Sequence, residues 1–264
     1  MLSLLKDVAH WFSGSPAPIC KPQRPARSRR ARLEQLEERR VLTTGYIESL
    51  YEVVLHRPAD PAGQAYYANL LAIGAGPITL ATQIWQSAEH RGLQVDSYYQ
   101  TYLHRPADPA GRQFWMTEME DGVSEEAVVT DMLKSPEYIA AHPTQTQFIT
   151  GLYQDLLNRA PDAAGLTTWM NVMAQRPGTT PGKLDPADEA YVASIQWPKV
   201  LQSIFESTER DTMLVGAMYN NFFQRPVDPA GLAAWVPQIS AIGVQSVSLD
   251  LLTSPEYLSD HPTP

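Results

Sequence analysis

Four arginines in this chain are each followed by an aspartate three residues later and by a glycine six residues later. The four phrases read RPADPAG, RPADPAG, RAPDAAG and RPVDPAG. A guanidinium beside carboxylates can bridge two acids or bind an anion, and gathered carboxylates can hold a cation or catalyse hydrolysis. The residues concerned are Arg57, Asp60 and Gly63; Arg105, Asp108 and Gly111; Arg159, Asp162 and Gly165; and Arg225, Asp228 and Gly231.

Three further features recur with each phrase. A tyrosine precedes each arginine by six residues, an aromatic residue follows it by ten, and a Ser-x-Glu sequence lies downstream. The four glutamates are Glu89, Glu137, Glu209 and Glu256. Features that agree in spacing four times over establish an internal repeat.

The elements that position these residues are expected to be helices. Before each arginine, apolar residues recur with the spacing of one helical face, as over residues 47–55. In the phrase, proline ends that helix, aspartate can cap the next one, and a second proline suits its first position. No stretch shows the alternation typical of a strand. The expected fold class is all-α, with four tandem repeats of three to four short helices, preceded by a disordered basic N-terminal tail.

The spacing of the phrases divides the chain. The third copy is longer than the others because of an insertion rich in Pro, Gly and Thr, which is typical of a loop. The expected organisation is a tail or targeting segment at 1–44, repeats at 45–93, 94–145, 146–213 and 214–264, and the insertion at about 176–193.

We interpret the repeated Arg, Asp, Gly and Glu residues as a structural clasp, in which the arginine bridges the capping aspartate and the later glutamate. The planar five-donor guanidinium explains why arginine, and never lysine, stands in all four copies. A calcium loop would need oxygen ligands at alternating positions, and after Asp60 the chain reads Pro-Ala-Gly-Gln-Ala-Tyr. No cofactor is therefore expected, and calcium remains the less favoured alternative.

Catalytic chemistry finds little support in the sequence. His56 and His104 precede the arginine in two copies, but Asn158 and Gln224 take their place in the others. No nucleophile stands at a motif spacing, and no phosphate-binding loop appears. We therefore expect a protein that is not an enzyme, with no catalytic, cofactor-binding or metal-binding residues assigned. Carboxylates could still meet in space, so a hydrolase with its site near the third-copy insertion remains an alternative.

Charge and hydropathy argue against some kinds of binding partner and against a membrane-spanning segment. Residues 1–40 hold nine Lys/Arg against four Asp/Glu, a net +5, while the remainder holds 11 basic against 25 acidic residues, a net −14. An acidic body repels nucleic acid, so no nucleic-acid partner is expected. No apolar run reaches the roughly 18–20 residues of a membrane span, so no transmembrane segment is expected. Cys20 is the single cysteine, which excludes an internal disulfide.

The segment RRARLEQLEERRVLTTG at 29–45 resembles an Arg-rich N-terminal segment of many planctomycete extracellular and surface proteins. This resemblance implies an extracellular or cell-surface location in a bacterium. The repeats themselves resemble the bacterial repeat called domain of unknown function 4214, which is similar to the helical linker domain of phycobilisomes. The shared pattern is Tyr-x3-Leu-x-Arg-x2-Asp-x2-Gly-x3-Trp, then Gly, then Ser-x-Glu-Tyr, over roughly residues 46–262.

That family implies an all-helical module of exported or surface proteins, without established catalytic residues. The expected function is therefore that of a non-enzymatic scaffold or protein–protein interaction module at the cell surface. Its expected partners are other surface or matrix proteins. A glycan- or matrix-binding adhesion module that uses exposed aromatic residues is the first alternative, and the sequence leaves the oligomeric state open.

Overall fold

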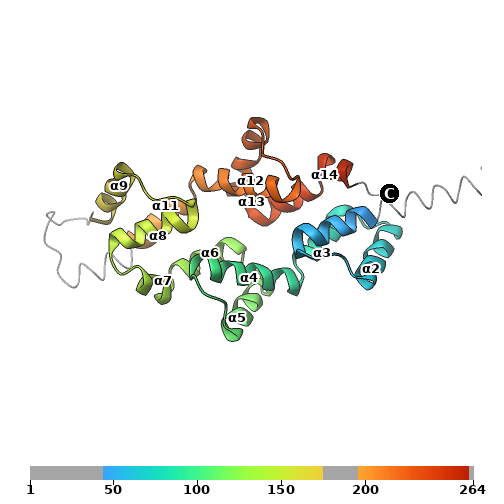
Figure 1. The fold of residues 1–264 in the computed structure, drawn as a ribbon, viewed down its shortest axis with the longest axis horizontal. Coiled ribbons are helices and arrows are strands. Elements are labelled where there is room, and N and C mark those ends of the chain that lie inside the picture. The colour runs from blue at the N-terminus through green and yellow to red at the C-terminus, as the bar shows by residue number, and fades with distance from the viewer. Residues whose placement is uncertain (1–43, 175–195, 262–264) are drawn as a thin grey trace, which may run out of the picture. The chain divides into compact units, whose positions relative to one another are not determined.

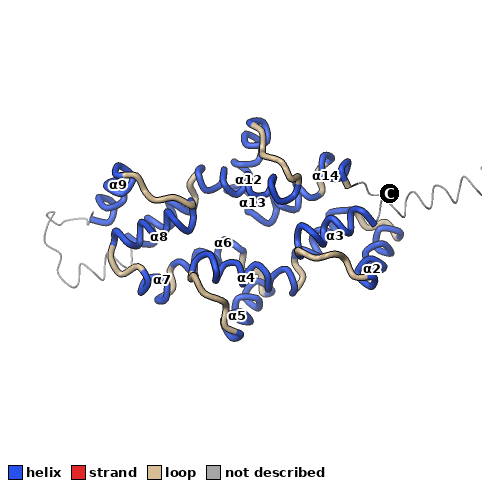
Figure 2. The backbone as a smooth tube through the Cα atoms, in the orientation of Figure 1, coloured by secondary structure: helices blue, strands red, loops and turns tan. Residues whose placement is uncertain are grey.

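The computed structural model describes residues 44–174 and 196–261 of the 264-residue chain. The expected disordered tail, apart from residue 44, and the expected insertion at 176–193 lie outside the described residues. Every regular element in the described ranges is a helix, as Figure 2 shows, so the all-α fold class predicted from the repeat pattern is confirmed.

The first helix of each copy carries the apolar face predicted from the sequence. These helices comprise residues 44–55 in copy one, α4 (Ala88–Tyr102) in copy two, α8 (Gln145–Leu157) in copy three and α12 (Thr208–Phe222) in copy four. Apolar residues of all four faces are buried, including Ile47, Val95, Ile149 and Val215, each with no exposed surface.

The second and third helices follow each Arg-x-x-Asp-x-x-Gly phrase. In copies one to three they are α2 (Pro61–Ala72) and α3 (Pro77–Trp85), α5 (Pro109–Glu120) and α6 (Glu125–Leu133), and α9 (Ala163–Ala174) and α11 (Trp197–Phe205). Copy four joins them in α13 (Pro229–Leu252). Figure 1 follows this order from blue to red.

In copy four the second and third helices are joined through a bend at Gly243. Gly243 in α13 has φ +85° and ψ 163°, which breaks the helix into residues 229–242 and 244–252. A positive φ of this kind is available to glycine because it has no Cβ. The stretch Pro229–Asp260 is long and apolar enough to cross a membrane, with a mean hydropathy of 1.2 over its 18-residue window. The break leaves two segments that are each shorter than the roughly 20 residues of a span.

The Ser-x-Glu sequence starts a helix in every copy. Its serine side chain accepts a hydrogen bond from the backbone N–H three residues later, which is the N-cap contact. In copies two and four this helix is short: α7 (Pro136–Ala141) and α14 (Pro255–Asp260). In copies one and three the serine instead opens the first helix of the next copy. The expected repeat boundaries at 93/94 and 213/214 consequently lie inside α4 and α12.

In the described part of the chain, three clusters of buried apolar side chains form the core. One cluster joins helices of copies one and four, and includes Tyr46 and Tyr257, neither of which is exposed. A second joins copies two and three around Tyr138 and Phe148. A third lies within copy two and includes Val95. Because copies one and four share a core, residues far apart in the sequence hold each other in place.

Candidate functional site

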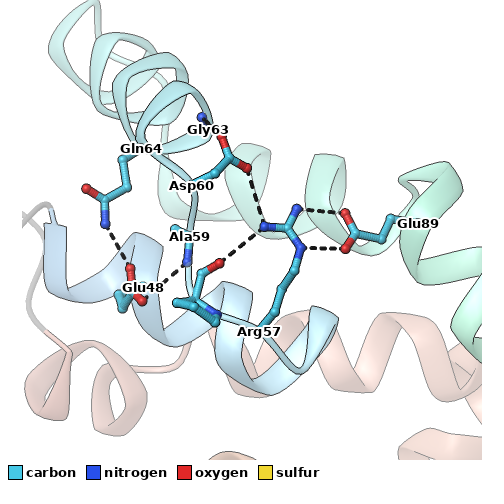
Figure 3. Close-up of polar contacts among 8 residues, drawn as sticks. Glu48, Arg57, Ala59, Asp60, Gly63, Gln64 and Glu89 are labelled. Atoms are coloured by element: carbon cyan, nitrogen blue, oxygen red, sulfur yellow. Dashed lines mark hydrogen bonds and ion pairs between the residues drawn. The ribbon is translucent and has the colours of Figure 1, made fainter.

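The repeated phrase forms a corner between the first and second helices of its copy. In copy one, Figure 3 shows the Arg57 guanidinium between Asp60 and Glu89. Its Nε and Nη2 donate to the two carboxylate oxygens of Glu89 at 2.5 and 2.8 Å, and its Nη1 donates to Asp60 at 3.3 Å. The same Nη1 donates to the Pro58 carbonyl at 3.2 Å. This arginine therefore ties the corner to the start of α4.

The other three copies repeat the contact between arginine and glutamate. Arg105 meets Glu137 at 2.5 and 2.8 Å, and Arg159 meets Glu209 at the same distances, although 50 residues separate the latter pair. Arg225 donates two hydrogen bonds to one oxygen of Glu256, at 3.0 and 2.5 Å. The third-copy insertion therefore lengthens the chain between the partners without changing how they meet.

The aspartate of the phrase makes one contact in all four copies and a second contact in three of them. Its carboxylate accepts from the backbone N–H of the glycine three residues on, at 2.7 to 2.9 Å in all four copies. The arginine lies 3.3 Å from Asp60 and 3.4 Å from Asp108, but 3.7 Å from Asp228. Among the described residues no hydrogen bond or ion pair joins Arg159 to Asp162. The aspartate is thus an N-cap in every copy and an ion-pair partner in three.

The recurring tyrosine explains the recurring glycine. Its ring lies under the guanidinium, with 4.9 to 5.0 Å between the guanidinium carbon and the ring centroid in each copy. A Cβ on Gly63 or Gly111 would collide with the hydroxyl of Tyr51 or Tyr99. In copy three, the Trp169 indole N–H donates to the same hydroxyl of Tyr153 at 2.9 Å. One tyrosine therefore joins the arginine, the glycine and the second-helix aromatic residue.

The residue before each arginine has a structural role that sequence reasoning missed. His56, His104, Asn158 and Gln224 all adopt left-handed backbone, with φ between 50° and 54°. In copies one to three, the arginine N–H that follows donates to the tyrosine carbonyl six residues back, at 3.3 to 3.5 Å. This is how a helix commonly ends, and asparagine is among the residues that tolerate it. The identity of the side chain varies because the position requires a backbone conformation.

Electrostatics favour the charged forms of these groups. The arginine hydrogen bond holds the pKa of Glu89, Glu137 and Glu209 below its usual value. The glycine N–H does the same for the pKa of Asp60 and Asp108. The carboxylates at the corners thus have donors already, from arginine and backbone, and the arrangement bridges helices without needing an added cation.

Replacing Arg105 with lysine tests the clasp. We expect the free energy of unfolding to fall by about 1–2 kcal/mol, because an ammonium cannot donate to both oxygens of Glu137 while covering the Tyr99 ring. The expected loss is modest because both side chains of this ion pair are more than a third exposed, so water screens their attraction. The melting temperature followed by circular dichroism should drop by about 2–6 °C.

Arg91→Lys is the control for this change, since Arg91 reaches Glu120 by a single contact of 3.7 Å. Its melting temperature should stay close to that of the unchanged chain. Equal melting of Arg105→Lys and the parent chain would remove the clasp as a source of stability.

A second polar bridge joins the first and second helices in copies one and two. Glu48 accepts from Gln64 at 2.8 Å and from the Ala59 backbone N–H at 3.2 Å, as Figure 3 shows. At the same positions in copy two, Arg112 donates to Asp96 at 2.9 and 3.0 Å. Sequence reasoning missed this bridge. The available signal was a polar pair separated by the same 16 residues in both copies.

Two aromatic side chains are exposed at matching places. Tyr66 and Phe114 each stand nine residues after the arginine of their copy, and each is 54% exposed. Tyr66 meets Tyr67 edge to face at 5.0 Å between ring centroids, and Phe114 meets Trp115 in the same way at 4.9 Å. Copies three and four have Thr168 and Ala234 at these positions. The exposed rings therefore distinguish the first two copies from the last two.

A hollow of about 730 Å³ lies among α6, α11, α12 and α13. The carboxylates that face it are engaged: Asp211 accepts from Ser240 at 2.9 Å, and Glu126 accepts from the Val244 backbone N–H at 2.6 Å. Arg210 is largely buried there, stacked on Phe205 at 3.7 Å. The site expected for a hydrolase, around 176–194, falls outside the described residues, as does Cys20. Within the described ranges no group of three or more His, Cys, Asp or Glu is placed to hold a metal ion.

Glu125 is a buried acid whose effect on stability should depend on pH. Burial raises its pKa, and it accepts a hydrogen bond from the Trp85 indole at 2.7 Å. The folded chain therefore holds this proton to a higher pH than the unfolded chain, so stability falls as pH rises from about 4.3 through the raised pKa. Glu125→Gln keeps the accepting oxygen and should stabilise the protein by about 1 kcal/mol at pH 7.5.

Denaturant unfolding at pH 4.5 and pH 7.5 measures this difference. The gain from Glu125→Gln should be larger at pH 7.5 than at pH 4.5. Glu52→Gln, the same change at an exposed position, is the control for the loss of a surface carboxylate. A gain of the same size at both pH values would show that Glu125 does not titrate in this range.

The fold and the corners together define an all-helical protein built from tandem copies of one module, each copy fastened by the same arginine. A family model for a domain of unknown function, DUF4214, matches residues 34–94, 94–142 and 139–179, more than half of the chain. The chain belongs to this family. No curated protein and no solved structure matches the chain.

Proposed function

We propose that the chain is a non-enzymatic scaffold or protein–protein interaction module that works outside the cell or at its surface. The repeated charged residues support this proposal because they bond to one another across each corner. Their chemistry serves the joint between helices, which leaves the surface of the repeats as the part that can recognise a partner. The proposed location rests on the N-terminal segment at 29–45 and its resemblance to segments of exported proteins.

The observation that carries the proposal is the exposed aromatic pair, Tyr66 and Phe114. Exposed aromatic residues that are held in place are typical anchors of protein interfaces. Each ring is packed against an aromatic neighbour, and the Tyr66 hydroxyl also donates to Gln83 at 3.4 Å. Ile73, the C-cap residue of α2, is 72% exposed and adds another exposed apolar side chain to copy one. These residues are ordered before a partner arrives, which lowers the entropy lost on binding.

A binding experiment with cell envelopes tests the proposal. The full chain and its double variant Tyr66→Ser/Phe114→Ser are incubated with envelopes of the encoding bacterium, and the bound fraction is measured. We expect the double variant to lose about tenfold in affinity, since two interface anchors are removed. Thr168→Ser, a change at the matching position of copy three, should bind like the parent chain. Equal retention of the double variant and the parent would exclude this surface.

A glycan- or matrix-binding adhesion module is the second candidate, favoured by the same exposed rings, because aromatic faces also stack on sugars. Treatment of the envelopes separates the two. Digestion of envelope proteins by a protease should abolish binding if the partner is a protein. Periodate oxidation of envelope sugars, with proteins left intact, should abolish it if the partner is a glycan.

A further inference from the structure

Copies one and two form a pair that is equivalent to the pair formed by copies three and four. Within each pair the Ser-x-Glu sequence runs directly into the next first helix, α4 or α12, and each pair ends in a short helix, α7 or α14. We call residues 44–141 the first half and residues 145–174 with 196–261 the second half. The contact from copy two to copy three is the 2–3 junction, and the contact from copy four to copy one is the 4–1 junction.

The 2–3 junction is made by neighbours in the sequence. Tyr138 of α7 meets Phe148 of α8 edge to face, with 6.0 Å between ring centroids and 78° between planes. The ring of His142 lies against Tyr138 at 4.4 Å. Residues 142–144 link the two helices, and Pro143 and Thr144 in that link are exposed.

The 4–1 junction repeats this geometry without a link. Tyr257 of α14 meets Tyr46 edge to face, with 6.2 Å between centroids and 75° between planes. The ring of His261 lies against Tyr257 at 4.6 Å. Tyr46 and Phe148 occupy the same position, eleven residues before the arginine of their copies. The Tyr46 hydroxyl also donates to the Leu252 carbonyl at 3.3 Å, across 206 residues of sequence.

Other contacts between the halves are equally independent of the link. The Asn221 side chain of α12 donates to the Val53 carbonyl at 3.2 Å. The Val244 backbone N–H donates to Glu126 at 2.6 Å. Each of these contacts needs a first half and a second half, and none needs both to belong to one chain.

We propose that two copies of this chain exchange halves, so that the second half of one chain forms both the 2–3 junction and the 4–1 junction with the first half of the other. The partner is a second copy of the chain because its halves match the exchanged contacts residue for residue. The exchange opens at the short link of residues 142–144, in which Pro143 and Thr144 are exposed. Such swapping costs little because each interface that opens within one chain forms again between two chains, and a high concentration of chains favours it.

Single-cysteine variants of the full chain detect the exchange. Both carry Cys20→Ser; one adds Val53→Cys and the other adds Asn221→Cys, two positions that meet at the interface between halves. The purified variants are mixed from about 10 µM to about 1 mM and treated with a short bismaleimide. We expect a cross-linked pair of chains that increases with concentration. Replacing the Asn221→Cys partner with Thr168→Cys, on α9, should give only the yield of random collision.

The link provides a second variant. Deleting Pro143 shortens the link, hinders α7 from folding back on its own α8 and should raise the dimer fraction several-fold by light scattering. Chains of natural length that stay monomeric at every concentration, with cross-linking no higher than in the Thr168→Cys control, would overturn the proposal. These measurements do not involve Tyr66 or Phe114, so they stand or fall apart from the proposed function.

Discussion

Replacing Phe148 with alanine is expected to lower the free energy of unfolding by about 3–5 kcal/mol. Phe148 is 2% exposed and stacks on Trp197, with 4.4 Å between ring centroids and 28° between planes, while Tyr138 packs on its edge. Trp197 begins α11, the helix that follows the third-copy insertion. Removing the ring leaves a cavity where α7, α8 and α11 meet, so copy three should lose more than the contact itself.

Phe114→Ala makes the same change at a position that is 54% exposed, and should alter stability by less than about 0.5 kcal/mol. Urea unfolding of both variants, followed by circular dichroism, measures the difference. Similar losses in the two variants would show that burial of Phe148 does not account for the stability of this junction.

Replacing Gly111 with alanine is expected to cost about 1–3 kcal/mol. The added methyl group would meet the Tyr99 hydroxyl, which lies over the glycine, while Tyr99 also lies under the Arg105 guanidinium. The tyrosine must move to admit the methyl group, and its movement disturbs the clasp. Because Gly111 lies in the first turn of α5 and has no positive φ, strain in the backbone does not contribute.

Gly216→Ala is the matched control, since no atom lies within 4 Å of its added Cβ. Gly216 lies inside α12, where alanine favours helix, so this variant should be more stable by about 0.5–1 kcal/mol. Adding Tyr99→Phe to Gly111→Ala removes the hydroxyl and should restore part of the loss. A stabilising Gly111→Ala would show that the tyrosine does not require the glycine.

The corner shows how far local sequence determines structure. The pattern of apolar residues predicted the first helices, and proline, aspartate and glycine predicted the corner that follows them. Both predictions succeed because helix capping and termination depend on residues only a few positions apart in the sequence. The motif also pointed to a contact of the arginine with both acids. A glycine at this place indicates that a neighbouring backbone or aromatic ring comes close. The motif did not reveal that this neighbour is the tyrosine six residues before the arginine, because its ring is positioned by the fold of the whole corner.

Backbone conformation could not be read from the sequence at the position before each arginine, which is occupied by residues 56, 104, 158 and 224. Two of these residues are histidines and the others are asparagine and glutamine, so no one side chain marks the position, yet all four share one left-handed backbone conformation. The break at Gly243 is similar, because the packing around it decides that α13 continues after a bend. Backbone conformation is fixed here by the elements on either side.

The sequence by itself determined that the chain is helical and that it repeats one module four times, and it pointed to the arginine and glutamate that meet at each corner. The tertiary structure alone decided which copies share a core. A periodic apolar face indicates that a helix is buried on that side, but not which helix packs against it. Because the first helices of the four copies have similar faces, several pairings of copies are compatible with the sequence. The contact of Tyr257 with Tyr46 therefore became visible only in three dimensions, where residues far apart in sequence pack together.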